Sequence, residues 1–339
     1  MEAIFSFIHS SSTMTILVLL AIAIAILGKS ADVLVEAAVE LSKKLGIPTV
    51  IVGATILSLG TTTPEAVVSV MAAIRGNPGL AMGNAAGSII CDTGLILGIA
   101  AIIGPLKIDF AAINKTAWIQ LACGVALALF CLPFGNIGSV FTTGGNLSQS
   151  SGWIFIVGLI IYMAYTIRAA QNSTVEPQQE EEGTFHSTFF LIGKILLCLV
   201  FVILSSELLI HCATELAKRM SIPDSVIAAT LVAFGTSLPE LITALMALKR
   251  HQSELAVGNI IGADILNVLF VAGAAASVTP GGLDAPGHFF TMVFPSMIAI
   301  LVCFRILTYF SKPVMPRWGG FILVAFYVII TVLSFTSAT

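Results

Sequence analysis

Residues 60–65, Gly-Thr-Thr-Thr-Pro-Glu, and residues 235–240, Gly-Thr-Ser-Leu-Pro-Glu, carry one pattern 175 positions apart. A second shared pattern follows: Gly-Asn-Ala-Ala-Gly at residues 83–87 and Gly-Asn-Ile-Ile-Gly at residues 258–262. With the same offset, residues 40–98 align with residues 215–273 without a gap, and 21 of the 59 aligned positions are identical. Chance similarity between hydrophobic helices would not keep the prolines, glycines and acids in register. The chain therefore contains an internal repeat.

The composition places this repeat in a membrane. Of the 339 residues, 57% are hydrophobic and 10% are charged, and the mean hydropathy is +1.03, outside the usual range of soluble domains. Ten apolar stretches approach the ~20 residues with which a helix crosses ~30 Å of hydrocarbon. They cover residues 15–40, 48–74, 80–104, 117–133, 153–170, 188–216, 224–248, 255–279, 288–309 and 319–336. The sequence predicts an all-α membrane protein with ten transmembrane helices.

One hydrophilic segment, residues 171–187, divides the chain into two halves of five spans each. The first half is residues 1–170 with its motif region at 40–98, and the second is residues 188–339 with its motif region at 215–273. Because five is odd, the second copy must enter the membrane with the opposite orientation. The sequence thus predicts two inverted five-helix repeats joined by a linker, an arrangement that places substrates near the bilayer midplane.

The positive charges predict how this arrangement is oriented. With the N-terminus outside, eleven Lys and Arg residues face the cytoplasm and three face the other side, as the positive-inside rule requires. The first apolar stretch is counted as a span, because residues 1–13 contain no Lys or Arg and no small-residue cleavage site ends the apolar run. We therefore expect both termini outside and the central linker in the cytoplasm. The six cysteines lie within spans without metal-ligand spacing and are expected to pack.

Glu65 and Glu240 each lie in the middle of an apolar stretch, where a carboxylate costs at least ~2.5 kcal/mol and usually faces a cavity or a partner. The core spans hold no basic residue to neutralise them. Lys29 is the one cation in mid-span, and its nearest acids by helical spacing are Asp32 and Glu36. Bound cations are thus the natural counter-charge for the two glutamates.

The neighbours of each glutamate are oxygen donors. Two hydroxyl residues precede each glutamate by three and four positions and share its helix face; they are Thr61, Thr62, Thr236 and Ser237. A proline precedes each glutamate and has no N–H, which frees the carbonyls of Gly60 and Gly235. Carboxylate, hydroxyl and carbonyl oxygens suit Na⁺ and Ca²⁺, and no histidine or cysteine is placed to suggest a softer metal.

The next span in each half adds polar residues, and here the halves differ. Ser88 and Asp92 lie four residues apart on one helix face, whereas the matching positions hold Ala263 and Asn267. The site should therefore be biased in charge towards the first half. Asp264, beside Ala263, lines the same cavity or has a structural role, and the sequence leaves both readings open.

The doubled motif, Gly-Thr-[Thr/Ser]-x-Pro-Glu followed by Gly-Asn-x-x-Gly-[Ser/Ala], resembles that of the cation/calcium exchanger superfamily, most closely its prokaryotic sodium/calcium exchanger branch. The resemblance covers both repeats. It implies a central core of four motif-bearing helices, against which the first helices of the halves, 15–40 and 188–216, slide. It also implies these metal-binding residues: Ser58, Thr61, Thr62, Glu65, Ser88, Asp92, Ala233, Thr236, Ser237, Glu240 and Asn267. Many members have a serine at the Ala263 position, so the number or affinity of sodium sites is left open.

Asp32 and Glu207 also occupy matching positions, but they lie on the two first helices and not in the core. We expect them to have a structural or gate-lining role.

The predicted function is Na⁺/Ca²⁺ antiport by alternating access, with Na⁺ and Ca²⁺ as cargo, no cofactor and no enzymatic activity. The protein is expected to be a monomer in a prokaryotic inner membrane. Proton/cation antiport remains the alternative, because buried carboxylates can carry H⁺ in place of Na⁺. A passive channel is disfavoured by the carboxylate-rich core. An enzyme is disfavoured by the lack of a nucleotide motif, a His/Cys metal cluster or a soluble domain.

Overall fold

The computed structural model of the protein describes residues 8–107, 110–133, 135, 137–172, 187–220, 235–311 and 313–337. Within these ranges, eight helices are long and apolar enough to cross a bilayer, and a pair of helices bent by 41° makes a ninth span. Nine of the ten predicted spans match these helices. Only the second part of the predicted span 224–248 lies within the described residues, as a helix over Leu238–Lys249. The predicted class, an all-α membrane protein, is confirmed, and the described helices are consistent with ten spans.

The elements follow one another in nearly the same order in both halves. The first half contains α2 (Thr13–Leu45), α3 (Thr49–Val52), η1 (Gly53–Leu57), α4 (Ser58–Thr61), α5 (Thr63–Ile74), α6 (Pro78–Ile90), η2 (Cys91–Ile96), α7 (Leu97–Ile103), β1 (Leu106–Lys107), α8 (Phe110–Phe130), η3 (Ile137–Ser139), α9 (Val140–Thr143), β2 (Gly145–Leu147) and α10 (Gln149–Asn172). The second contains α11 (Thr188–Arg219), α14 (Leu238–Lys249), α15 (Ser253–Leu266), η5 (Asn267–Ala272), α16 (Gly273–Val278), β3 (Leu283–Ala285), η6 (Phe289–Val293), α17 (Phe294–Phe310), β4 (Val314–Met315) and α18 (Arg317–Ser337).

The helices that carry the glutamates have matching boundaries. Helices α5 and α14 are both 12 residues long, and their first and last residues lie 175 positions apart, as do the first residues of α6 and α15. The turns that follow also match: Gly76 has φ 80° and His251 has φ 58°, the one positive φ of a described non-glycine residue. Since L-residues rarely adopt this conformation, its recurrence at the matching position is consistent with the internal repeat.

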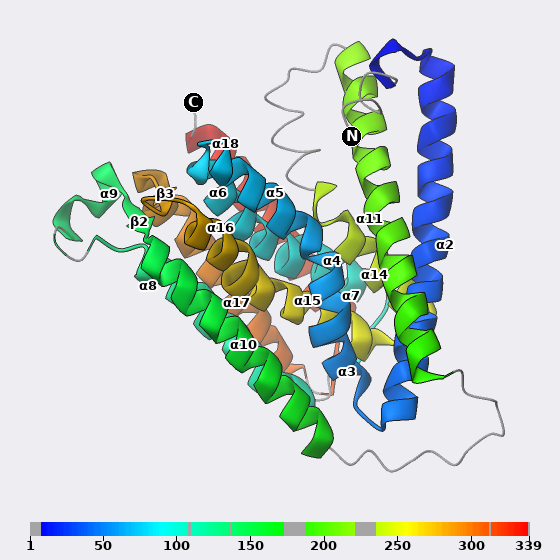
Figure 1. Ribbon diagram of the computed structural model, residues 1–339. Coiled ribbons are helices and arrows are strands. Elements are labelled where there is room, and N and C mark those ends of the chain that lie inside the picture. The colour runs from blue at the N-terminus through cyan, green and yellow to red at the C-terminus, as the bar shows by residue number, and fades with distance from the viewer. Residues whose placement is uncertain are drawn as a thin grey trace.

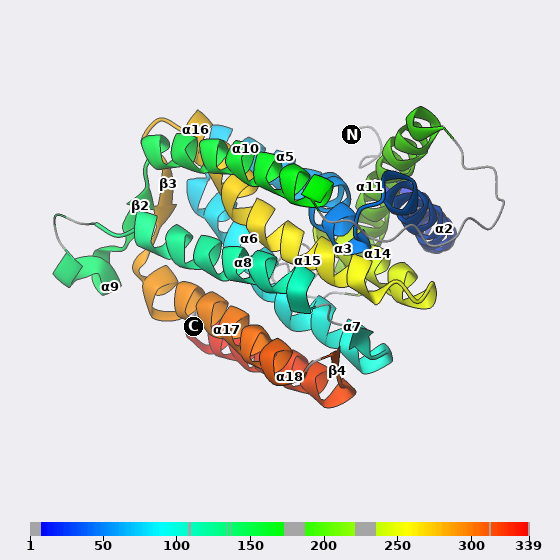
Figure 2. The same ribbon diagram turned by 90° about the horizontal axis from the view of Figure 1, so that it is seen from below.

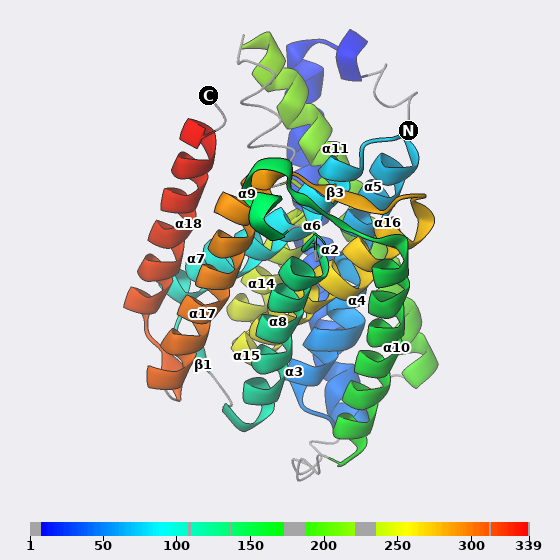
Figure 3. The same cartoon turned by 90° about the vertical axis from the view of Figure 1, so that its left-hand side faces the viewer.

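The outer helices of each half cover the inner helices of the other half. Helix α10 packs on α16, and α18 packs on α7. Glycines allow both approaches: a Cβ on Gly320 would lie 2.5 Å from the carbonyl oxygen of Gly98, and one on Gly152 would lie 2.6 Å from the backbone nitrogen of Ser277. The short strands are exchanged in the same way, because β1 pairs with β4 and β2 with β3. Figure 3 shows the two outer helices α18 and α10 on opposite sides of the molecule. The halves are interlocked and do not lie side by side.

Helix α15 lies at the centre of this arrangement (Figure 2). Of an 18-residue apolar stretch within its span, Ser253–Val278, 94% is buried. The corresponding share is 22% for α2 and 22% for α18. It packs against α3, η1 and α4 of the first half and against α14 of its own. The core of the molecule is therefore built from the segments that carry the repeated motifs.

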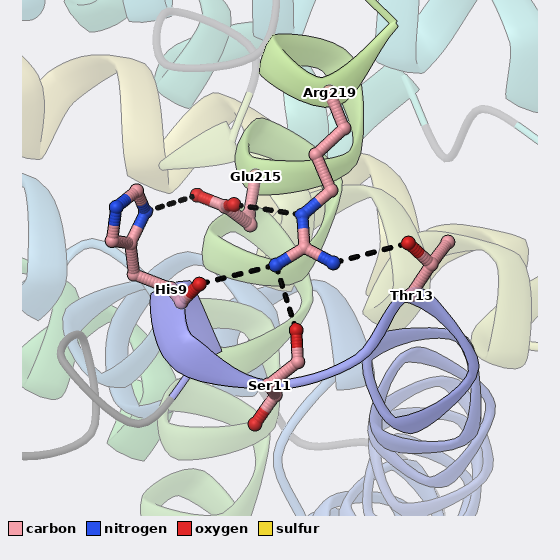
Figure 4. Close-up of polar contacts among 5 residues, drawn as sticks. All are labelled: His9, Ser11, Thr13, Glu215 and Arg219. Atoms are coloured by element: carbon pink, nitrogen blue, oxygen red, sulfur yellow. Dashed lines mark hydrogen bonds and ion pairs between the residues drawn. The ribbon is translucent and has the colours of Figure 1, made fainter.

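Helices α2 and α11 pack against each other and run in opposite directions. The pair stands beside the rest of the molecule (Figure 1). Arg219, at the end of α11, ties the pair together at one end. Its guanidinium donates to Glu215 Oε1 at 2.9 Å, to Thr13 Oγ1 at 3.1 Å and to the carbonyl oxygen of Ser11 at 2.8 Å (Figure 4). His9 Nδ1 lies 3.1 Å from Glu215 Oε2. These contacts join α2 to α11 and not to the core, so the two helices can behave as one unit.

Candidate ion-binding site

Glu65 and Glu240 lie in the first turns of α5 and α14, and each is 1% exposed. The chain breaks directly before α5: Thr62 N–H closes the last turn on Ser58 O at 2.9 Å, and Pro64 supplies no N–H to continue it. Thr62 Oγ1 lies 3.4 Å from Glu240 Oε1 and donates to it. The hydroxyl face of one half therefore meets the glutamate of the other, a contact that the sequence did not predict.

Two asparagines of the second motif join the halves in a matching way. Thr61 Oγ1 donates to Asn259 Oδ1 at 3.5 Å, and Thr236 Oγ1 donates to Asn84 Oδ1 at 3.5 Å. Asn84 also donates to Ser69 Oγ at 3.0 Å. The predicted site does not include these asparagines, although their identity at matching positions of the repeat is a signal that points to them. They hold the two motif-bearing layers in register around the glutamates.

Asp92 and Asn267 each occupy the beginning of a π-helical segment. Asp92 is the second residue of η2 and Asn267 is the first residue of η5, and both are 1% exposed. π-helical turns inside α-helices occur frequently at functional sites, because the extra residue redirects side chains and backbone carbonyls. Ser88, one turn before Asp92, is 2% exposed. The acid and amide that distinguish the halves are therefore in matching structural positions.

Six predicted site residues have a buried oxygen with no hydrogen-bond partner among the described residues. These oxygens are Glu65 Oε2, Ser88 Oγ, Asp92 Oδ1, Ser237 Oγ, Glu240 Oε2 and Asn267 Oδ1. A buried acceptor without a donor costs ~1–3 kcal/mol, and a cation can satisfy several at once. No three His, Cys, Asp or Glu side chains in the described part of the chain could hold a metal ion by themselves. The acceptors offered by this site are a mixture of carboxylate, hydroxyl and amide oxygens.

For the three remaining predicted residues, Ser58, Thr236 and Ala233, no buried oxygen without a partner is described. Ser58 is fully buried, and its hydroxyl donates to the carbonyl oxygen of Thr55 at 3.2 Å, a local bond that membrane hydroxyls commonly make. Thr236 is half-buried. Ala233 lies outside the described residues.

Glycines of the second motif bring α15 close to the first half. A Cβ on Gly258 would lie 2.3 Å from the carbonyl oxygen of Val50, and one on Gly262 would lie 2.6 Å from Cα of Ala54 and from Oγ of Ser58. Only glycine allows backbones to approach so closely. Such spaced small residues would allow close approach in both halves, but the matching glycines of the first half do not show it. A Cβ on Gly83 would lie 3.9 Å from the Phe289 ring, and one on Gly87 would meet nothing within 4 Å among the described residues.

Asp264 belongs to a buried polar network beside the site. Its Oδ2 accepts hydrogen bonds from the Thr93 hydroxyl and, at 2.5 Å, from Gln120 Nε2 of α8, and Gln120 also donates to Thr93 Oγ1 at 3.1 Å. Because Thr93 follows Asp92 directly, the network ties η2 to α8 and α15. A signal existed in the sequence, since Gln120 is the one amide in the apolar stretch 117–133.

Asp32 and Glu36 of α2 do not pair with Lys29. Arg250, which follows α14, donates from Nε to Asp32 Oδ1 at 2.7 Å and from Nη2 to Glu36 Oε2 at 2.8 Å. Lys194 of α11 donates to Glu36 Oε1 at 3.3 Å. The spacing rule that pointed to Lys29 considers one helix alone, whereas these partners come from residues brought close by tertiary packing.

In this multi-pass membrane protein, buried carboxylate, hydroxyl and amide oxygens lie on interrupted helices. This arrangement is typical of ion-transporting membrane proteins, and it places the chain in that class. The profile of the family described as sodium/calcium exchanger protein matches residues 15–168 and residues 190–336. The chain belongs to the sodium/calcium exchanger protein family.

Several relatives match most of the chain. The "Uncharacterized membrane protein MJ0091" of Methanocaldococcus jannaschii is 31% identical over 297 residues, covering 86% of this chain and 88% of that protein. The sodium/calcium exchanger MaX1 of Methanosarcina acetivorans is 29% identical, covering 95% of this chain and 99% of that protein. The solved structure of the sodium-calcium exchanger NCX_Mj, soaked with 10 mM Na⁺ and zero Ca²⁺, superimposes with a TM-score of 0.79 at 26% identity, covering 94% of this chain and 98% of that one.

Proposed function

We propose that this exchanger moves Na⁺ and Ca²⁺ in opposite directions through one buried site that contains Glu65, Asp92 and Glu240. The observation that supports the proposal is the set of buried oxygens without partners, which come from both halves and include one oxygen of each glutamate. Hard cations such as Na⁺ and Ca²⁺ bind carboxylate, hydroxyl and carbonyl-type oxygens. The relatives MaX1 and NCX_Mj, which carry the name of sodium/calcium exchangers, support the same ions.

The charge of the site accounts for obligatory exchange. Three carboxylates can be matched by several Na⁺, or by one Ca²⁺ together with partial protonation, so each cargo excludes the other. An empty and fully ionised site would repel itself in a low-dielectric interior, which disfavours crossing the membrane unloaded. Ala263 offers no hydroxyl where the first half has Ser88, and we propose that one sodium position is weakened for that reason.

Sodium coupling is tested by comparing two driving forces. In proteoliposomes loaded with Na⁺, Ca²⁺ uptake is expected to follow the outward Na⁺ gradient at a fixed pH, since Na⁺ and Ca²⁺ share the site. A pH gradient at constant Na⁺ is expected to drive little uptake. The measurement is ⁴⁵Ca²⁺ accumulation under each gradient. Uptake driven by the pH gradient alone would establish the alternative, proton/cation antiport.

A second test uses the difference in charge between Asp92 of the first half and Asn267 at the matching position of the second half. Asp92→Asn is expected to weaken Ca²⁺ exchange by about tenfold, because a neutral ligand replaces a charged one and charged hydrogen-bond and ion contacts are worth ~1.5–3 kcal/mol. In the double variant Asp92→Asn/Asn267→Asp, the charge returns from the matching position of the other half. Exchange in the double variant should recover towards the wild-type rate. If it stays as low as in the single variant, the two positions do not contribute to one site.

The boundaries of the repeats, their orientation in the membrane and the oligomeric state complete the proposal. We propose residues 1–170 and 188–339 as inverted repeats with 171–187 as a cytoplasmic linker, and the excess of Lys and Arg in the loops expected on the linker side supports this orientation. We propose a monomer in the inner membrane, without a cofactor or enzymatic activity. The relative YrbG of Escherichia coli, 32% identical over 289 residues and covering 81% of this chain, is named an inner membrane protein.

A further inference from the structure

Arg75 and Arg250 are geometrically equivalent residues with different surroundings. They lie 175 positions apart, each directly after the helix that carries a glutamate. Their backbones agree closely, with φ −79° and ψ 8° for Arg75 and φ −90° and ψ 11° for Arg250, and the turn hydrogen bonds that follow correspond one to one. The two arginines therefore occupy equivalent backbone positions in the two halves of the core.

Only one of these arginines contacts the α2–α11 pair. Arg250 makes the two bonds to Asp32 and Glu36 described above. Arg75 is exposed and has no ion pair or hydrogen bond from its side chain to any described residue. The acid that matches Asp32 is Glu207 of α11, which instead lies 3.1 Å from His211 on its own helix. Among the described residues, an arginine ion pair therefore joins the core to the helix pair at the Arg250 end and not at the Arg75 end.

The tied end is bridged by polar side chains. A cavity of about 280 Å³ separates α2 from the start of α15, and it is lined by Glu36, Val39, Glu40, Lys43, Arg250 and Gln252. The hydrogen bond with Asp32 raises the pKa of the Arg250 guanidinium above its ordinary value, so Arg250 stays charged throughout the physiological range. Long charged side chains that span a cavity can separate without breaking apolar packing.

Inverted repeats exchange their conformations when the site changes its exposure from one side to the other. The contact now made by Arg250 with Asp32 would then be made by Arg75 with Glu207, and Arg250 would be released. We propose that Arg75 and Arg250 are alternating positioning residues, each of which stabilises one of the two end states of transport by holding the α2–α11 pair at its own end of the core. This inference rests on the proposed alternating-access function.

The two contacts are unequal in charge. Arg250 meets two carboxylates, Asp32 and Glu36, whereas the position that matches Glu36 is His211. Arg75 would therefore gain one carboxylate partner and a histidine in the other end state. The state with Arg250 engaged is consequently favoured in the resting protein.

Side-resolved transport kinetics test this proposal. Apparent affinity falls in proportion to the population of the state that is open to a given side, so the ratio of apparent KM values for Ca²⁺, measured in right-side-out and inside-out vesicles, reports the balance of states. Arg250→Ala is expected to move this ratio about fivefold in one direction. Arg75→Ala is expected to move it in the opposite direction, by less because that contact has fewer carboxylates. The double variant Arg75→Ala/Arg250→Ala should return towards the wild-type ratio.

Further variants distinguish loss of the arginine contact from a general effect of removing a charge and from misfolding. Lys115→Ala removes an exposed charge of α8, a helix outside the α2–α11 pair, and should leave the ratio unchanged, whereas Glu207→Gln should reproduce Arg75→Ala and add nothing to it. Shifts of both arginine variants in the same direction, or no shift in either, would overturn the proposal. Loss of Na⁺-driven Ca²⁺ uptake by the wild-type protein in the same vesicles would instead refute the proposed function, so the two failures are distinguishable.

Discussion

Glu240→Gln is expected to reduce Na⁺-driven Ca²⁺ uptake by about 100-fold or more. The substitution keeps the size of the side chain and the acceptor for Thr62, but it removes the charge that a cation must neutralise. Removing one member of a buried charge pair costs ~3–5 kcal/mol, and each ~1.4 kcal/mol corresponds to a factor of ten in binding. Glu65→Gln should have a similar effect, because Glu65 is equally buried and also has an oxygen without a partner. The measurement is ⁴⁵Ca²⁺ uptake together with equilibrium Ca²⁺ binding to the purified protein.

Asp284→Asn is the matched control for these changes. It replaces an exposed carboxylate of β3, which accepts a hydrogen bond from Asn146 Nδ2 at 3.2 Å, by an amide of the same size. Uptake by this variant should remain near the wild-type rate. Full exchange activity in either Glu65→Gln or Glu240→Gln would remove both glutamates from the centre of the mechanism.

Gly258→Ala is expected to have the second largest effect, a loss of about 2–3 kcal/mol in the free energy of unfolding. A Cβ at this position would lie 2.3 Å from the carbonyl oxygen of Val50 and 2.9 Å from its Cα. Because these are backbone atoms, no rotamer change relieves the clash, and overpacking of this kind typically costs ~1–3 kcal/mol. Helix α15 must move away from α3, which also separates Asn259 from Thr61. The expected readout is a lower thermal unfolding midpoint of the purified protein, with weaker Ca²⁺ binding.

Gly28→Ala provides the control for Gly258→Ala. Gly28 lies inside α2, and a Cβ there would meet nothing within 4 Å among the described residues. Because alanine favours helix over glycine by ~0.5–1 kcal/mol, this variant should be as stable as the wild type or slightly more stable. Equal stability of the Gly258→Ala and wild-type proteins would show that α15 does not pack on α3 as described.

The sequence predicted the main acids of the proposed site but not how they are connected. A carboxylate in an apolar stretch is conspicuous, and the repeated Pro-Glu pattern located Glu65 and Glu240 directly. The contact between Thr62 and Glu240 was not predictable, because helical spacing relates residues of one helix, and these two are 178 positions apart. For the same reason, spacing pointed to Lys29 as the neighbour of Asp32, although Arg250 is its partner.

Membrane insertion, the number and approximate positions of the described spans, and the repeated motifs were determined by the sequence alone. These properties depend on local hydropathy and on residues such as Pro64 and Pro239, which act within their own helix. The tertiary structure alone decided that the outer helices are exchanged between the halves, that the asparagines of one half bind the threonines of the other, and that Arg250 is engaged while Arg75 is not. Such contacts join segments more than 100 residues apart, and their free energies depend on the distance between side chains, which no pattern within one helix contains.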